Sequence, residues 1–392
     1  MNEPLHSTFK DIFATDKEPL TFFAPGRINL IGEHTDYNGG YVFPASISFG
    51  TYALVSQRED QTIRFYSMNF PEVGVVTIDL ATLDYDTKHN WANYPKGMIQ
   101  FMRSQGASIS NGFDVLYYGN IPNGAGLSSS ASIEMVTGVF LKALFDTSFN
   151  QLDLIQIGQR VENEYIGVNS GIMDQFAIGL GKQDHAIHLD TSTLNYDYAP
   201  IHLPEHHILI INTNKERTLH DSKYNERREQ CESALQDLQK ELQIQHLCDI
   251  TPEEFERYAS LITNPVDKRR ARHAIYENQR TIEALEQLKQ HNLQAFGELM
   301  NASHQSLKED YEVTGIELDT IAETAQKQPG VLGARMTGAG FGGCAIAIVE
   351  KEHVQQVQTN IQQIYSEKIG YKPTFYIANI GDQAKQISNE VI

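Results

Sequence analysis

A glycine- and serine-rich segment between residues 120 and 130 has the composition of a phosphate-binding loop. Gly124 and Gly126 carry no side chain, so their backbone N–H groups can approach an anion closely. The serines that follow can cap a helix, whose start adds partial positive charge, and can donate hydroxyls to phosphate or Mg²⁺. The candidates for nucleotide binding in this segment are Pro122, Gly124, Ala125, Gly126, Leu127, Ser128, Ser129 and Ser130.

The segment differs from the P-loop pattern GxxxxGK[ST], because no lysine follows its glycines. Positive charge at such a site must then come from backbone dipoles, a metal ion and residues elsewhere in the chain. The alternative is a helix N-cap preceded by a flexible glycine linker, and the segment by itself leaves both interpretations open.

A second segment, residues 27–40, is rich in ionisable and turn-forming residues. It follows a short predicted strand, Thr21 to Phe23, which we expect to break at residues 24–26. Solvent-exposed loops have this composition, and so do functional sites. Its ionisable side chains, which include Arg27, Glu33, His34 and Asp36, are therefore candidates for chemistry.

A third glycine segment, residues 338–343, satisfies the pattern GxGxxG. In a dinucleotide-binding fold this pattern must follow a strand and open a helix. Residues 344–349 instead form an apolar run that is typical of a strand. We therefore reject nicotinamide binding and predict a glycine turn between two strands, with its backbone close to a ligand.

The elements that must position these segments change in character along the chain. The first half alternates strands, expected at 41–43, 50–57, 62–67, 112–118 and 208–212, with helices at 91–103, 131–145 and 152–165. Charged runs with apolar periodicity then predict helices at 226–242, 252–261, 266–290, 293–307 and 316–327. Strand and turn residues return at 331–350, before a last helix at 354–368 and a strand at 373–378. We expect the domain border between about residues 180 and 215.

Length and composition narrow the class of protein. A chain of 392 residues favours two domains that share a cleft. Its 50 acidic and 31 basic residues give a net charge of -19, which disfavours nucleic acid as a partner. The basic run 268–273 lies on a predicted helix beside acidic residues, and we interpret it as a solvated or salt-bridged face. Three cysteines without CxxC spacing, and no signal-peptide or membrane-span pattern, favour a reducing cytoplasm.

Five short motifs, spread over nearly the whole chain, resemble those of known kinases. Residues 24–40, APGRINLIGEHTDYNGG, resemble the signature of the galactokinase family. Residues 122–131, PNGAGLSSSA, resemble the ATP loop of the wider GHMP kinase superfamily, and residues 336–344, MTGAGFGGC, resemble its third motif. The segments GIMDQF at 171–176 and SKYNERR at 222–228 are also similar to galactokinases. The first motif is the most specific, because in the family it lines the sugar pocket.

The resemblance implies a two-domain α+β GHMP kinase fold, with a mixed sheet and helices in each domain and the active site in the cleft between them. We expect an N-terminal domain over residues 1–200, with the sugar signature and the ATP loop, and a helix-rich C-terminal domain over 201–392. The activity implied is transfer of the γ-phosphate of MgATP to the C1 hydroxyl of galactose. Such a transfer needs positioning, charge neutralisation and an activated acceptor oxygen.

By this resemblance Asp174 is the general base and Arg27 its partner. Asp174 lies among small and apolar residues, where a carboxylate is rarely left unpaired, and a structural, paired aspartate is the alternative. A guanidinium beside it favours the ionised carboxylate, or can stabilise charge on the phosphoryl group or the sugar oxygen. Ser170 stands where galactokinases often have cysteine, a small and similar side chain.

The resemblance also implies a sugar site at Glu33, His34 and Asp36. Carboxylates suit this task because each can accept hydrogen bonds from two adjacent hydroxyls, and fixed polar groups select one epimer. Family analogy adds Tyr224 and the backbone N–H of Gly171. For His34 the alternative is a turn histidine with local hydrogen bonds, and a metal ion at this cluster is disfavoured by its irregular ligand spacing.

Magnesium takes oxygen ligands, often only one or two of them from protein. The resemblance implies Ser130 and Glu162 as those ligands, with a solvated helical glutamate as the alternative for Glu162. Trp91, the only tryptophan, can stack on adenine, and a core tryptophan is the alternative.

Two other functions compete with a galactokinase. A sensor that binds galactose and ATP without catalysis is disfavoured, because residues 130–132 are uninterrupted and Arg27 and Asp174 are both present. A GHMP kinase for N-acetylgalactosamine, mevalonate or homoserine is the other alternative, although the last two substrates would not need the sugar-type cluster at 33–36. We expect a cytoplasmic protein, either a monomer or a weak dimer, that binds a small-molecule substrate and neither nucleic acid nor a membrane.

Overall fold

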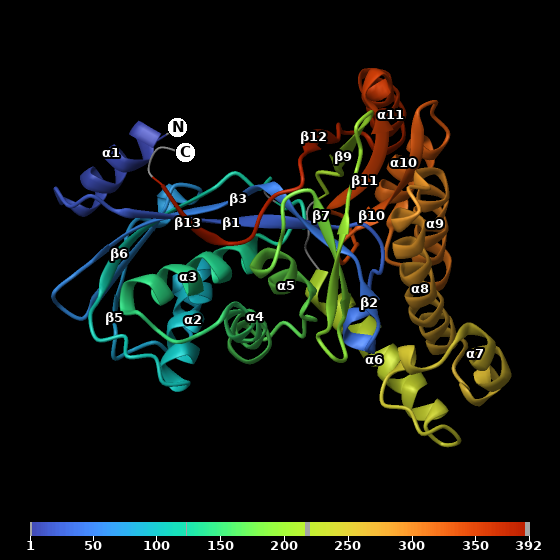
Figure 1. The fold of residues 1–392 in the computed structure, drawn as a ribbon, viewed down its shortest axis with the longest axis horizontal. Helices are drawn as coiled ribbons and strands as arrows, with labels where there is room; N and C mark the ends of the chain where they lie inside the picture. The colour runs from blue at the N-terminus through green and yellow to red at the C-terminus, as the bar shows by residue number, and fades with distance from the viewer. Residues whose placement is uncertain (1, 123, 216–219, 389–392) are drawn as a thin grey trace.

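Two lobes, each built on its own sheet, make up the computed structural model, which describes residues 2–122, 124–215 and 220–388 (Figure 1). The first lobe contains a six-stranded sheet in the order β13-β1-β3-β6-β4-β5. Neighbouring strands are antiparallel except β4 and β6, which run parallel. The strands are β1 (Leu20–Asn29), β3 (Pro44–Gln57), β4 (Thr62–Ser67), β5 (Val76–Asp79), β6 (Phe113–Gly119) and β13 (Lys385–Ile387).

Helices cover both faces of this sheet. On one face lie α2 (Asn93–Ser104), α3 (Ser129–Phe145), α4 (Gln151–Arg160) and α5 (Met173–Gly179), and α1 (Asn2–Phe13) lies on the other (Figure 1). Phe9 and Phe13 of α1 pack against Leu54 and Leu116 of the sheet. Burial of apolar side chains on both faces stabilises the sheet. A small sheet of β2 (Tyr41–Val42), β7 (His185–Asp190) and β8 (Tyr196–Pro200) completes this part of the chain.

The second lobe is an antiparallel four-stranded sheet in the order β10-β11-β9-β12, with helices packed against it (Figure 1). Its strands are β9 (His206–Asn212), β10 (Val331–Thr337), β11 (Cys344–Glu350) and β12 (Thr374–Ala378). Its helices are α6 (His220–Leu238), α7 (Pro252–Tyr258), α8 (Pro265–Lys289), α9 (Leu293–Ser306), α10 (Gly315–Gln326) and α11 (Val354–Ile369). One apolar cluster joins the lobes, because Ile28 and Phe43 pack with Ile210 and Ile346.

The α+β architecture and the helix-rich second half are confirmed. The glycine segment 338–343 is a turn between β10 and β11, as the apolar run after it predicted. Among the described α-helices and strands, six elements were not predicted: the helices α1 and α5 and the strands β5, β7, β8 and β13. The last of these, β13, pairs with β1. The domain border near residue 200 stays a prediction, and β13 is a segment from beyond it that joins the first sheet.

The expected break of the first strand at residues 24–26 is wrong. β1 continues to Asn29, with a register shift between Pro25, which pairs with Gly50, and Arg27, which pairs with Ser46. A strand tolerates proline at such an irregularity, because the missing N–H falls where the ladder is already interrupted. The polar segment therefore enters the interior rather than an exposed loop: Arg27, Asn29, Glu33, His34 and Thr35 are all buried.

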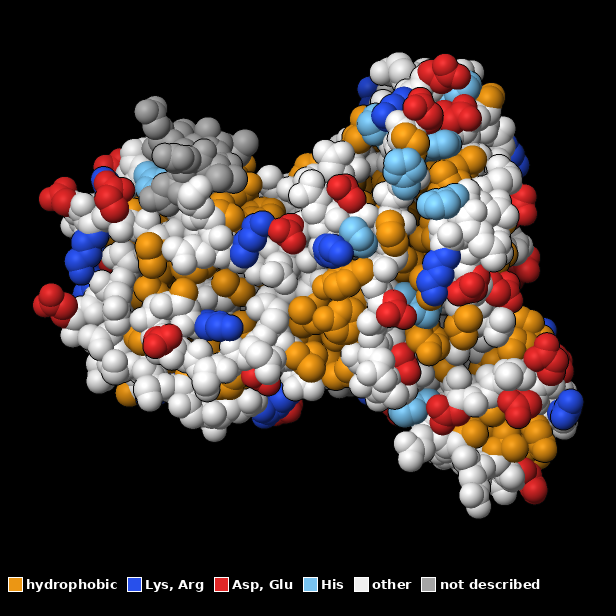
Figure 2. Space-filling model, viewed as in Figure 1, with side chains coloured by type: hydrophobic (Ala, Val, Ile, Leu, Met, Phe, Trp, Pro, Cys, Tyr) orange, Lys and Arg blue, Asp and Glu red, His pale blue; other side chains and the backbone are white. Residues whose placement is uncertain are grey.

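The charged run on α8 forms ion pairs, as predicted. Arg269 and Arg270 contact Glu312, and Arg272 contacts Glu256. On the face drawn in Figure 2, acidic and basic side chains are interspersed among the coloured residues. Among the residues that the structure describes, no helix has the length and apolarity that crossing a bilayer requires.

Candidate active site

A single pocket brings the separate sequence motifs together. Its volume is about 280 Å³. Its lining includes these predicted residues: Arg27, Glu33, His34, Asp36, Gly124, Gly126, Ser128, Ser129, Ser130, Glu162, Gly171, Asp174 and Tyr224. Tyr224, Gly338 and Ala339 come from the second half of the chain, so both halves contribute to the pocket.

The glycine-serine loop has a defined shape. Gly124 and Gly126 have φ values of 68° and 70°, in the left-handed region that favours glycine. Ala125 and Leu127 are buried in the apolar cluster between the lobes, so the loop is anchored and the flexible-linker alternative is disfavoured. The loop leads directly into α3 at Ser129, whose first backbone N–H groups lack helical partners and suit an anion. Pro122 precedes the loop, and Asn123 lies outside the described residues.

Of the serines that could cap the helix, Ser128 stands at the N-cap position of α3 but does not cap it. Ser128 has a φ of 63° and its side chain makes no capping hydrogen bond to α3. Its Oγ instead donates to Oδ2 of Asp174 over 2.5 Å. The hydroxyl therefore links the loop to the predicted base rather than stabilising the helix.

Arg27 and Asp174 form a bidentate ion pair at the pocket wall. Nε and Nη2 of Arg27 donate to Oδ1 and Oδ2 of Asp174 over 2.8 and 2.9 Å. Arg27 also holds the loop, because Nη1 donates to the carbonyl of Gly126 and its backbone N–H to that of Leu127. Gly26 permits this approach, since a Cβ there would lie 2.7 Å from the Leu127 oxygen.

The pocket has a surplus of acidic groups. Four carboxyls, those of Glu33, Asp36, Glu162 and Asp174, face one guanidinium, that of Arg27, among the described lining residues. Burial raises the pKa of Glu33 and of Glu162, and it raises that of Asp36 to about 7, to which Asp174 and Glu33 add. Because Arg27 is already paired with Asp174, a polyphosphate needs a further cation to be held here.

Ser130 and Glu162, the two residues predicted as magnesium ligands, are hydrogen-bonded to each other. Oγ of Ser130 donates to Oε1 of Glu162 over 2.8 Å, and the Ser170 hydroxyl donates to Oε2. Glu162 lies on a π-helical turn, Val161–Ile166, and is only 7% exposed, so it is not the solvated helical glutamate of the alternative. A hydroxyl and a carboxylate are hard oxygen donors of the kind that Mg²⁺ prefers, so these residues fit that ion.

The sugar motif is held close to the loop. Gly171 lies against Asp36, because a Cβ on Gly171 would be 1.7 Å from Oδ2 of that aspartate. Both ring nitrogens of His34 contact the protein: Nδ1 is 2.8 Å from Tyr37 Oη, and Nε2 is 3.2 Å from the Ala339 carbonyl oxygen. The Tyr224 ring lies 5.7 Å from the His34 ring, between centroids. His34 thus has the hydrogen bonds that the turn alternative predicts, while it also lines the pocket.

Four predicted residues do not line the pocket: Pro122, Ala125, Leu127 and Trp91. Of these, Trp91 is the one that lies outside the glycine-serine loop. It is 7% exposed and packs in the core of the first lobe against Phe65 and Tyr117. The core alternative therefore accounts for its position. Tyr94, which the sequence analysis did not single out, is an aromatic residue that does line the pocket.

Two contacts that support the site from the second half of the chain were not predicted. Ala339 accepts from His34, and the backbone N–H of Gly338 donates to Glu33 over 2.7 Å. The glycine turn was predicted to lie close to a ligand, but not which residues it would contact. A signal for these contacts was absent, because more than 300 positions separate the partners in the sequence.

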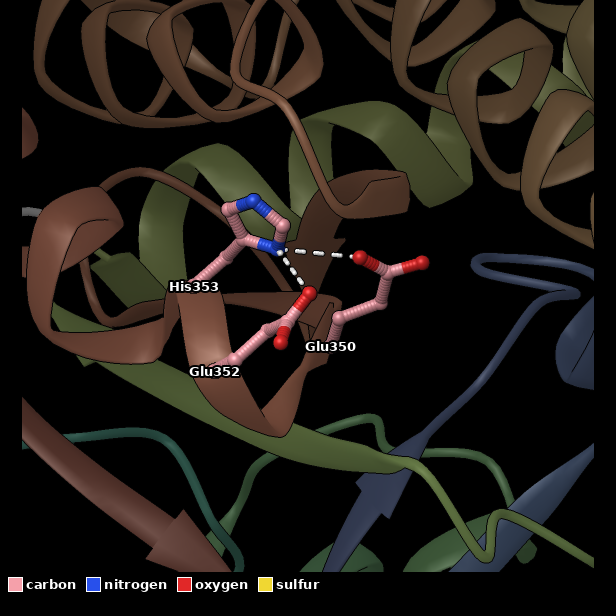
Figure 3. Close-up of side chains that lie close together, drawn as sticks. All are labelled: Glu350, Glu352 and His353. Atoms are coloured by element: carbon pink, nitrogen blue, oxygen red, sulfur yellow. Dashed lines mark ion pairs between the residues drawn. The ribbon is translucent and has the colours of Figure 1, made fainter.

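Another group of possible metal ligands lies elsewhere. Glu350 is the last residue of β11, and Glu352 and His353 follow it. Nδ1 of His353 is 2.9 Å from Oε2 of Glu350 and 3.9 Å from Oε1 of Glu352 (Figure 3). This group stands at the opposite end of β11 from the glycine turn. It therefore takes no part in the pocket.

Comparisons with known proteins agree with the geometry. A model of the galactokinase galactose-binding signature matches residues 7–57, one of the GHMP kinases N terminal domain matches 93–182, and one of the GHMP kinases C terminal matches 284–367. A galactokinase of Ligilactobacillus salivarius is 56% identical over 381 residues, which are 97% of this chain and 98% of that protein. A galactokinase of Staphylococcus saprophyticus is 55% identical over 387 residues, 99% and 100% of the two chains.

Two solved structures of kinases are also similar to this chain. The crystal structure of Lactococcus lactis galactokinase complexed with galactose has a TM-score of 0.97 and 52% identity to this chain, and covers 98% of this chain and 99% of that one. A mevalonate kinase crystal structure has a TM-score of 0.66 at 18% identity, and covers 93% of this chain and 100% of that one. At that identity the second likeness concerns the fold alone.

Proposed function

Because this chain belongs to the galactokinase family and is an ATP-dependent sugar kinase, we propose that it transfers the γ-phosphate of MgATP to the C1 hydroxyl of α-D-galactose, giving galactose 1-phosphate and ADP. The observation that carries this proposal is that one pocket contains both the Gly124–Ser130 loop and the carboxyls of Glu33, Asp36 and Asp174. A phosphate donor and a neutral polyol would meet there, within one cavity.

In this proposal the loop holds the nucleotide. Backbone N–H groups between Gly124 and Ser130 bind phosphate oxygens at the start of α3. Ser130 and Glu162 hold Mg²⁺, which when bound supplies the positive charge that neutralises the phosphates. The acid surplus of the pocket supports this requirement, since the loop brings no lysine of its own.

The sugar would lie on the other side of Asp174. Glu33 and Asp36 accept hydrogen bonds from its hydroxyls, and the packing of Gly171 against Asp36 fixes where that carboxyl stands. Fixed acceptors of this kind discriminate between epimers, because a misplaced hydroxyl leaves a buried acceptor unpaired. Tyr224 lines the pocket from the second half of the chain.

Asp174 would accept the proton of the C1 hydroxyl as that oxygen attacks the γ-phosphorus. Arg27 keeps the carboxylate oriented through two hydrogen bonds, and Ser128 adds a third. The guanidinium of Arg27 also lies at the loop, where negative charge redistributes during the transfer. Positioning and charge stabilisation of this kind supply most of the catalysis in phosphoryl transfer.

The test is a kinase assay with MgATP across galactose, glucose, N-acetylgalactosamine and mevalonate. We expect the highest kcat/KM for galactose. Saturable galactose binding without ADP release would identify a sensor instead, and a preference for N-acetylgalactosamine would identify that kinase. A monomer in the cytoplasm, with the three cysteines as free thiols, completes the proposal, and sedimentation analysis checks the oligomeric state.

A further inference from the structure

Arg335 is a fully buried guanidinium next to the pocket but not in its lining. It lies on β10 with 0% exposure. Burial of an arginine is unfavourable unless its charge is paired and its N–H groups are used. Nη1 donates to the carbonyl of Asn29 over 3.0 Å and lies 3.5 Å from Oε1 of Glu33, and Nη2 lies 3.9 Å from Oε1 of Glu277.

The second carboxylate, Glu277 on α8, is already satisfied by other groups. Burial alone would raise its pKa, but Arg280, His273 and Arg335 lower the pKa of Glu277 to about 2. It accepts from Arg280 and from Ser303, and its Oε1 also accepts from the backbone N–H of Gly32 over 3.0 Å. Glu277 therefore anchors the backbone that leads into Glu33.

The backbone carbonyl of Glu33 is held from α8 as well. Nε2 of His273 lies 3.1 Å from this oxygen, and its Nδ1 lies 2.8 Å from the Ser306 hydroxyl. Burial lowers the pKa of His273 to about 4, so the ring is neutral and its Nε2–H is the donor to the carbonyl. Residues of the second half of the chain thus fix the backbone at Glu33, independently of its side chain.

Two groups from the second half of the chain hold one oxygen of the Glu33 side chain. Oε1 accepts from the backbone N–H of Gly338 over 2.7 Å and faces Arg335. Burial raises the pKa of this carboxyl, and the Arg335 charge opposes that rise. Both contacts use Oε1, so a hydroxyl in the pocket would meet Oε2.

We propose that Arg335 is a positioning residue for sugar recognition: it holds the carboxylate of Glu33 so that Oε2 meets one hydroxyl of the sugar, without touching the sugar itself. The inference rests on the proposed function, in which Glu33 binds the sugar. A guanidinium suits this task better than an ammonium, because Nη1 contacts both the Asn29 carbonyl and Glu33 while the delocalised charge also lies near Glu277.

The experiment compares kcat/KM for galactose with that for 2-, 3-, 4- and 6-deoxygalactose. In the wild-type enzyme we expect kcat/KM to be about 10- to 100-fold lower for the deoxy sugar that lacks the hydroxyl bound by Glu33 than for galactose. This decrease is the penalty for that sugar. Glu33→Gln should reduce this penalty for one deoxy sugar and so identify the hydroxyl. Arg335→Lys should reduce the penalty for the same sugar to below about threefold, with KM for ATP unchanged.

The control is Arg64→Lys, because Arg64 makes a bidentate pair with Asp114 on the six-stranded sheet, outside the pocket. It should keep the wild-type pattern across all four sugars. If Glu33→Gln alters no penalty, Glu33 does not bind the sugar, and both that part of the proposed function and the role of Arg335 are contradicted. If Glu33→Gln abolishes one penalty and folded Arg335→Lys retains it, the inference alone is overturned.

A crystal structure of the wild-type enzyme with galactose decides the question even if Arg335→Lys does not fold. We expect Oε1 of Glu33 on the Gly338 N–H and Arg335, with Oε2 on a sugar hydroxyl. Direct contact between Arg335 and the sugar, or a Glu33 carboxylate turned away from Arg335, would overturn the proposal.

Discussion

The guanidinium of Arg27 meets the carboxylate of Asp174 through two hydrogen bonds, across 147 positions of the sequence. Arg27 comes from the end of a strand, and Asp174 comes from the first turn of α5. The same guanidinium holds the carbonyl of Gly126 in the loop. One side chain therefore ties the predicted base to the predicted phosphate site, and the consequences can be tested separately.

Replacement of either partner should stop turnover without unfolding the protein. We expect Asp174→Asn and Arg27→Ala to lower kcat by about 10³-fold or more, because the proton acceptor or its orientation is lost. Steady-state ADP release measures kcat, and circular dichroism checks the fold. Asp382→Asn, at an exposed ion pair with Lys385, is the matched control and should retain wild-type turnover. Wild-type rates in either folded site variant would contradict these roles.

Ser128→Ala should affect catalysis rather than helix stability. Its hydroxyl donates to Asp174 and does not cap α3. Loss of this hydrogen bond removes one of the groups that orient the Asp174 carboxylate, so kcat should fall by roughly tenfold or more. The melting temperature should stay within a degree or two, since no cap is removed. A large drop in melting temperature with unchanged kcat would reverse this assignment.

Gly171→Ala should weaken the sugar more than the nucleotide. The new methyl group would occupy the position of the Asp36 carboxylate and displace it. We expect KM for galactose to rise by about 10- to 100-fold, as in Asp36→Ala, with little change in KM for ATP. Gly119→Ala is the control, because the nearest atom to its new Cβ would be 3.6 Å away. A raised KM for ATP with an unchanged KM for galactose would contradict the sugar role of Asp36.

Glu162→Gln and Ser130→Ala should raise the Mg²⁺ concentration needed for activity. Each removes one of the paired oxygen donors, and we expect the half-saturating Mg²⁺ concentration to rise by about tenfold or more. Electron paramagnetic resonance of Mn²⁺ with a nonhydrolysable ATP analogue measures metal binding without turnover. Glu164→Gln, on the same helical turn but exposed and paired with Arg160, should leave it unchanged. Unaltered Mn²⁺ affinity in both site variants would exclude them as ligands.

Asp36 should make the protein less stable as the pH rises towards neutrality. Its folded pKa is raised to about 7 by burial and by Asp174 and Glu33, above an ordinary value of 3.8. The folded state therefore binds a proton that the unfolded state has lost, and this contribution to stability disappears as the pH rises from about 4 to about 7. The melting temperature of the wild type relative to Asp36→Asn should fall over that range. A constant difference between the two proteins would contradict the raised pKa.

Local sequence patterns predicted many of the helices and strands. Apolar periodicity over 266–290 and 293–307 predicted α8 and α9 almost to their ends, and the apolar run 344–349 identified β11. The missed strand β13 has three residues and little periodicity, so only its pairing with β1 defines it. The polar segment at 27–35 was expected to be exposed because its composition is that of a loop, yet it is buried.

By itself the sequence determined the family and most of the residues that meet in the pocket, because these are carried by short motifs of fixed composition. Apolar periodicity determined the helical second half. Only the tertiary structure decided how those residues are held: Ser128 turned to Asp174 instead of the helix, Trp91 packed in the core, and Glu33 fixed by Arg335 and Gly338 from about 300 positions away. The physical reason is that hydrogen bonds and burial depend on distances in space. Such distances arise from packing between the lobes, which no local pattern of residues contains.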